Sequence, residues 1–223
     1  MHIADARIVS IEEARAYVAP LLARHLSPPD LQAALDNDLM FADAYDRSGV
    51  LLLPEGAQIA GDLRLDHAMA TYDGRPFRGI LALGALWVEG DIVNDAADSG
   101  PFLVVLGCLC VRHIIKGGSP VIVMGPLVSP GVIYCQHNHG SFRAFGGIAA
   151  LGIIIEDRRY HIAGPVSGVR LIMAEDDASD FLLPRFFCAD DDGTIEPIED
   201  FEEVLKRHIR SGAAIFRDDV PTG

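Results

Sequence analysis

The chain has 223 residues, half of them hydrophobic, and a formal net charge of −14 at pH 7. This charge argues against binding to nucleic acid, whose phosphates are also negative, and it favours a basic protein partner. No apolar run is long enough to cross a bilayer, and the first residues do not resemble a secretory signal, so we expect a cytoplasmic protein without membrane contact.

Residues 1–49 are expected to form a helical cap. Ser10 followed by Glu13 is a capping-box pattern that begins a helix. A second helix is expected at Ser27, with Pro28 in its first turn. We interpret these helices as a lid over the first coil of the domain that follows, and an independent recognition domain is the alternative.

Residues 50–174 are dominated by a repeat. It aligns on glycines spaced 18 to 23 residues apart, namely Gly61, Gly84, Gly107, Gly125, Gly146 and Gly164. Aliphatic or small residues lie two positions before these glycines, at Ile59, Ala82, Val105, Val123, Ala144 and Ile162. Further columns lie two positions after them, at Leu63, Leu86, Leu109, Leu127, Ile148 and Val166, and eight positions after them, at Met69, Ile92, Ile115, Ile133, Ile154 and Ile172. Aliphatic columns at this period are typical of stacked β-coils. The predicted fold is therefore mainly β, a parallel β-helix (β-solenoid) of about six right-handed coils with helical segments at both termini.

The third position after each glycine should face outward, because side chains alternate along a strand. Its central members are apolar, namely Trp87, Cys110 and Val128. An outward apolar column is either covered by the chain's own helices or is an interface. If the chain forms a homodimer, this column is the predicted seam.

The longer turns between coils carry the polar candidates. They contain Asp73, Arg75, Asp95, Asp98, His137, Asn138, His139, Asp157 and Arg158. Corresponding loops of successive coils lie above one another, so we predict a single polar edge that binds a basic protein. For His137 and His139, a hydrogen-bonded turn and a metal-chelating pair are the alternatives.

No catalytic residue, metal site or cofactor is predicted. The sequence has no G-x-S-x-G elbow, and Lys116 to Ser119 lack the frame of a phosphate loop. The cysteines Cys108, Cys110, Cys135 and Cys188 show no C-x-x-C spacing, so we interpret them as buried thiols, with disulfide or metal use as alternatives. Residues 175–223 are predicted to be an acidic segment followed by a helix over 197–211 that ends at Gly212.

The segments Gly61-Asp62-Leu63, Gly84-Ala85-Leu86 and Gly107-Cys108-Leu109 resemble the G-x-L coils of bactofilin-like, polymer-forming β-helix proteins. The resemblance covers about Ala57 to Ala174 and implies a right-handed parallel β-helix without enzymatic activity. A second resemblance, to the left-handed β-helices of hexapeptide acyltransferases and γ-class carbonic anhydrases, rests on histidines at coil edges and would imply a metal-dependent enzyme. The expected function is that of a non-enzymatic acidic binding or scaffold protein, one form of which is an inhibitor or immunity-type protein for a basic partner. The polymer-forming scaffold and the metal enzyme are the alternatives.

Overall fold

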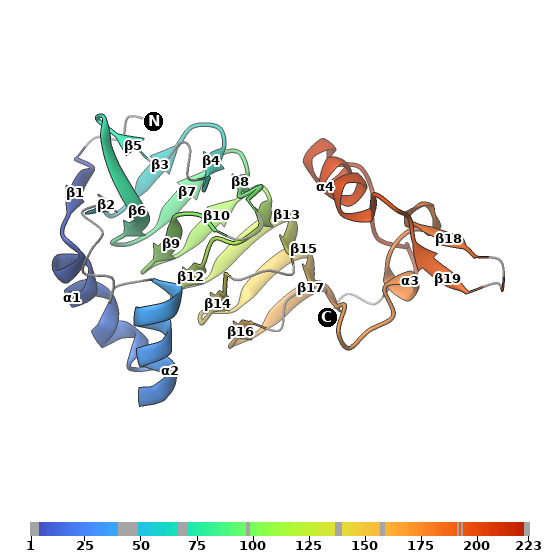
Figure 1. Cartoon of the computed structure of the whole chain (residues 1–223), viewed down its shortest axis with the longest axis horizontal. Helices are drawn as coiled ribbons and strands as arrows, with labels where there is room; N and C mark the ends of the chain where they lie inside the picture. Colours follow the sequence, from blue (N-terminus) through green and yellow to red (C-terminus); the bar gives the residue numbers. More distant parts are fainter. Residues whose placement is uncertain are drawn as a thin grey trace.

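The chain is mainly β in a computed structural model, with a parallel β-solenoid flanked by helical segments (Figure 1). The structure describes residues 5–39, 49–66, 71–96, 99–136, 140–156, 159–190, 192 and 194–220. The solenoid has three sides, because three ladders of parallel strands follow one another along the chain. We call them side 1, side 2 and side 3 in the order in which the chain meets them.

Side 1 is formed by short strands that pair in parallel. They are β2 (Gly49–Leu53), β6 (Arg75–Ala82), β9 (Phe102–Val105), β12 (Val121–Val123), β14 (Phe142–Ala144) and β16 (Tyr160–Ile162). The hairpin partner of β6 is β5 (Thr71–Tyr72). The central strands β9 and β12 are buried on both faces, which explains runs such as Phe102-Leu103-Val104-Val105 that are apolar at every position.

Sides 2 and 3 share their later strands. Side 2 comprises β3 (Ala57–Ile59), β7 (Leu86–Val88), β10 (Leu109–Val111) and the first parts of β13 (Leu127–Cys135), β15 (Ile148–Ile155) and β17 (Val166–Ile172). Side 3 comprises β4 (Leu63–Arg64), β8 (Ile92–Val93), β11 (Ile114–Lys116) and the second parts of the same long strands. The register shifts between Ser129 and Val132 in β13, so the corner between the two sides is a bulge there.

The N-terminal elements cover side 1 from outside. They are β1 (Arg7–Val9), α1 (Ile11–Leu22), α2 (Pro28–Ala33) and the π-helix η1 (Ala34–Asp38). The Oγ of Ser10 accepts a hydrogen bond from the Glu13 amide at 3.1 Å, as the capping pattern predicts. Val18 and Leu35 join a cluster with the outward residues of side 1, such as Val104. The helices therefore pack along the flank of the coils rather than over their first end, where β1 pairs antiparallel with β2.

The C-terminal elements cover side 3. They are α3 (Ala178–Phe181), η3 (Pro184–Phe186), β18 (Phe187–Ala189), β19 (Ile195–Pro197) and α4 (Phe201–Ser211). Leu205 and Ile209 of α4 belong to one buried cluster with Tyr134 and Ile154 of side 3. The helix predicted over 197–211 thus exists but begins at Phe201, and Gly212 ends it at a φ of 69°.

The register of the first coil differs from the prediction. Leu86 pairs with Ala57 and not with Leu63, which pairs with Ile92 instead. The glycine alignment sets Gly61 at the same corner as Gly84, but Gly61 lies against Gly90 in the structure. The residue next to Gly84 is Glu55. Likewise Leu53, not Ile59, precedes Ala82 in the ladder of side 1. From Gly84 onward, the columns before and after the glycines pair as predicted.

The column eight positions after each glycine is divided between two environments. Ile92 and Ile133 lie in the interior cluster, as expected. Ile115 and Ile154 instead belong to the cluster under the C-terminal elements. The corners between sides 2 and 3 differ in length. The residue eight positions after the glycine therefore faces the interior in some coils and faces outward in others. Met69 lies outside the described residues.

The predicted mainly β fold with a parallel β-solenoid and a few helices is confirmed. The number of coils, their handedness and the domain boundaries stay predictions. In the part of the chain that the structure describes, no helix is both long and apolar enough to cross a membrane.

Candidate functional site

Side 2 carries a ladder of outward side chains that we call the open ladder. It consists of Gln58, Trp87, Cys110, Val128, Ala149 and Ser167, which pair in register from strand to strand. Trp87 and Val128 are each 41% exposed, although both are large and apolar. Trp87, Cys110 and Val128 therefore face outward in register, with Gln58 before them in the same ladder, and their role as a dimer seam stays a prediction.

Local alternation explains why these residues face outward. In β7, Leu86 and Val88 are buried in the solenoid interior, so the residue between them must point away from it. In β10 the same rule buries Leu109 and Val111 and turns Cys110 outward. Sides 1 and 3 show the same outward apolar columns, but the terminal segments bury them. Side 2 differs because its outward column stays exposed or half-buried.

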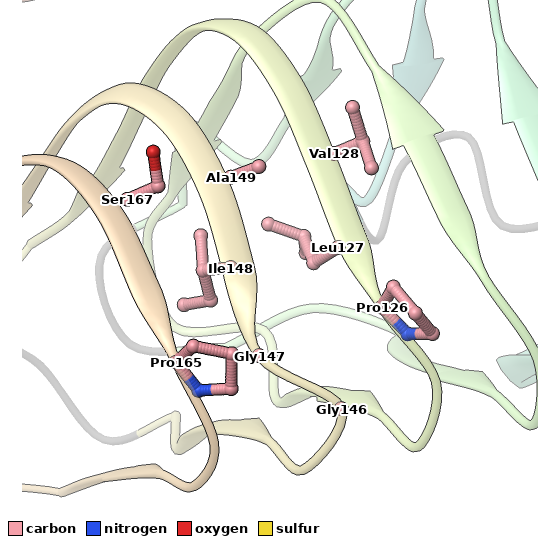
Figure 2. Close-up of a pocket in the computed structure, with 9 residues that line it drawn as sticks. All are labelled: Pro126, Leu127, Val128, Gly146, Gly147, Ile148, Ala149, Pro165 and Ser167. Carbon is pink, nitrogen blue, oxygen red and sulfur yellow. The ribbon is translucent and has the colours of Figure 1, made fainter.

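A shallow apolar groove extends the open ladder toward the corner with side 1. Its volume is about 210 Å³, and its rim includes Pro126 and Pro165. Figure 2 shows Val128, Ala149 and Ser167 on three neighbouring strands, with the glycine turns at the corner below them. A groove lined by prolines, glycines and small apolar side chains suits contact with another apolar surface better than polar chemistry.

The edge of side 2 nearest to side 3 is charged. Arg112 donates to Asp91 from Nε at 2.7 Å and from Nη2 at 3.0 Å. Asp62 lies 4.0 Å from the same guanidinium, and Glu89 is exposed nearby in sequence. The carboxylate of Asp91 is almost wholly buried and pairs with an exposed arginine, so this corner is held by an ion pair.

Two thiols meet on the open side. The Sγ atoms of Cys108 and Cys110 lie 3.7 Å apart, and both residues are half-buried. Burial raises the pKa of Cys108 to about 11, so the thiol is protonated at neutral pH. Cys135 is buried in the interior, as predicted for a core thiol, whereas Cys188 is exposed.

Of the predicted polar edge, the structure describes Asp73, Arg75 and Asp95, which all lie in connections from side 3 to side 1; the edge itself stays a prediction. Asp73 and Arg75 belong to the β5–β6 hairpin, whose Asp-Gly turn places Asp73 at a φ of 49°. Asp95 accepts hydrogen bonds from Arg64 and Arg210, and it thereby ties α4 to the solenoid. The other residues of the predicted edge lie outside the described residues, namely Asp98, His137, Asn138, His139, Asp157 and Arg158.

The described histidines have structural partners. The Nδ1 atom of His113 accepts a hydrogen bond from the Val132 amide at 2.9 Å, and burial lowers the pKa of this imidazole. The His161 ring packs 5.1 Å from the ring of Phe145. Over the described ranges, no three histidine, cysteine or acidic side chains gather closely enough to hold a metal ion.

A polar cavity of about 350 Å³ lies between η1 and side 1, and no sequence motif predicts it. It is lined by Asn37, Asp38, Ser141, Arg143, Arg159 and Tyr160. Asp38 Oδ2 accepts hydrogen bonds from Arg143 Nε at 3.1 Å and Nη2 at 3.0 Å across 105 positions of sequence. A single-sequence pattern holds no signal for such a distant pair. This ion pair fastens the N-terminal elements to the solenoid.

The chain matches no protein-family model, no curated protein and no solved structure. The fold and the open ladder therefore define only a class, a parallel β-solenoid with two sides covered by its own terminal segments and an exposed apolar third side.

Proposed function

We propose that the chain is a non-enzymatic binding or scaffold protein that self-associates through the open ladder. The exposure of Trp87 and Val128 carries this proposal, because a chain that covers two apolar sides with its own segments leaves the third for another surface. The solenoid in this proposal has about six right-handed coils.

A second copy fits the open ladder for geometric reasons. Parallel strands in register give a flat surface whose side chains repeat from coil to coil. A two-fold contact places the same patch on both chains opposite itself, so apolar residues meet apolar residues. The net charge of −14 then remains on the outer surfaces of the dimer, where it favours a basic protein partner.

The test measures the mass of the protein in solution across a range of concentrations, in buffer with a chelator. We expect a dimer that dissociates on dilution. Val128→Asp places a charge in the ladder and should give a monomer that melts at the temperature of the dissociated, dilute wild-type chain. Ile195→Asp is the matched control, because Ile195 is 55% exposed on β19, away from side 2, and this variant should still form the dimer.

A wild-type chain that stays monomeric at all concentrations would contradict self-association. A dimer that persists in Val128→Asp would place the contact elsewhere. Filaments seen by negative-stain microscopy would favour the polymer-forming scaffold instead, because a closed two-fold contact ends growth at two chains.

A further inference from the structure

We propose that Cys108 and Cys110 form half of a zinc–thiolate site, completed by the same two cysteines of a second copy across the open ladder. The proposal rests on the proposed self-association. It adds a ligand class, a soft divalent cation held by four thiolates, and it explains the position of a thiol pair beside the exposed apolar side chains of Trp87 and Val128.

The distance between the two sulfur atoms matches a chelate. Zinc–sulfur bonds of about 2.3 Å at the tetrahedral angle hold two sulfurs about 3.8 Å apart. The Sγ atoms of Cys108 and Cys110 are 3.7 Å apart. Side chains two positions apart on an extended strand need not approach so closely, since the strand itself advances about 6.6 Å over that interval. The two sulfur atoms therefore lie at the separation needed to chelate one zinc ion.

A structural zinc site takes four ligands, and Cys108 and Cys110 supply two of them. In the described part of the chain, no third histidine, cysteine or acidic residue lies near enough to complete the set. The neighbours of Cys110 in the ladder are Trp87 and Val128, which offer no ligand atom suited to zinc. The described residues therefore offer no further ligand, and the two-fold contact would bring an identical pair to the axis.

The surroundings suit a site that forms on assembly. Both thiols are half-buried, so they are accessible in the single chain and would be enclosed by a second copy. Zinc binds cysteine as the thiolate, so it must displace the proton of each thiol. One Zn²⁺ ion forms four zinc–sulfur bonds, and the four thiol protons pass to the solvent. Binding should therefore strengthen as pH rises.

The experiment titrates zinc ions alone into the full-length, metal-free protein and follows mass and metal content. We expect one zinc per two chains and a fall in the dimer dissociation constant of at least about ten-fold, because a ligand that binds only the dimer favours it by mass action. Cobalt in place of zinc should give the charge-transfer absorption of cobalt–thiolate bonds. Zinc should also protect Cys108 and Cys110 from alkylation in the wild-type chain, a readout that needs no variant.

Cys108→Ser and Cys110→Ser should each abolish the effect of zinc while the weaker dimer in chelator remains. Cys188→Ser is the control, because that cysteine lies on β18, and it should respond to zinc as the wild type does. An unchanged dimer constant in zinc, one zinc per single chain, or alkylation that zinc does not slow would each overturn the shared site. If one of these results is found while the wild-type chain still dimerises in buffer with a chelator, the zinc site is refuted and the proposed function stands. If the wild-type chain does not dimerise in buffer with a chelator, the proposed function itself is refuted.

Discussion

Truncation of two isoleucines tests the packing of the solenoid. Ile133 and Ile115 are both fully buried, but they belong to different clusters. Ile133 faces the interior, where Ile114 and Ile153 lie directly before and after it in the same column. Ile115 faces outward and is covered by the cluster that holds α4. Ile133→Ala and Ile115→Ala therefore remove the same atoms from two different kinds of core.

We expect both variants to be destabilised within the range of about 2 to 5 kcal/mol that buried large-to-alanine changes cost. Ile133→Ala should lie near the upper end, at about 4 kcal/mol, because parallel ladders fixed on either side prevent the cavity from closing. Ile115→Ala should cost about 3 kcal/mol, since the C-terminal elements can settle toward the gap. For a chain of this length, about 4 kcal/mol lowers the melting temperature by about 8 to 16 °C.

Urea unfolding measures the two free energies, and hydrogen exchange of the amides in α4 separates the two mechanisms. Ile115→Ala should raise exchange in α4 selectively, whereas Ile133→Ala should raise it throughout the solenoid. Ile195→Ala serves as the exposed control and should change stability by less than about 0.5 kcal/mol. Losses below that value at both isoleucines would show that neither residue is in a core.

Other predictions concern a corner, an ion pair and a histidine. Gly125→Ala should prevent normal folding, since a Cβ there would lie 2.6 Å from the Gly107 carbonyl carbon and oxygen; wild-type circular dichroism and melting would refute this. Asp38→Ala should cost about 3 kcal/mol, because it leaves Arg143 largely buried without its carboxylate, and exchange in α1 should rise; unchanged protection would refute the anchoring role. Burial lowers the pKa of His113, so its contribution to stability is present above the unfolded value of about 6.5 and is lost as pH falls below it. His113→Asn keeps an acceptor and should lose less stability than wild type between about pH 7.5 and pH 5.5, as followed by urea unfolding; equal losses would exclude His113 as the source.

The sequence predicts the ladders well where each coil has one glycine corner of constant form. Leu86, Leu109 and Leu127 pair as expected, because the corners before them keep one length from coil to coil. The predicted register of the first coil is wrong because two kinds of corner contain glycine. A single sequence does not distinguish the corner at Gly61 from the corner at Gly84.

The candidate site was predictable in one respect only. Strand alternation placed Trp87 and Val128 outward, since that rule needs no knowledge of other elements. Which sides the terminal segments cover depends on tertiary packing, so the exposure of side 2 had to come from the structure. The contact between Cys108 and Cys110 was likewise hidden, because spacing alone does not fix side-chain torsions.

Fluorescence of the single tryptophan tests the open ladder most directly. Trp87 is the only tryptophan in the chain and is 41% exposed on the proposed contact surface. As protein concentration rises through the dimer transition, its emission should move to shorter wavelength, in step with the increase in mass. Val128→Asp should abolish both changes, and Ile195→Asp neither. A rise in mass without any shift in Trp87 emission, or no rise in mass at all, would contradict the account.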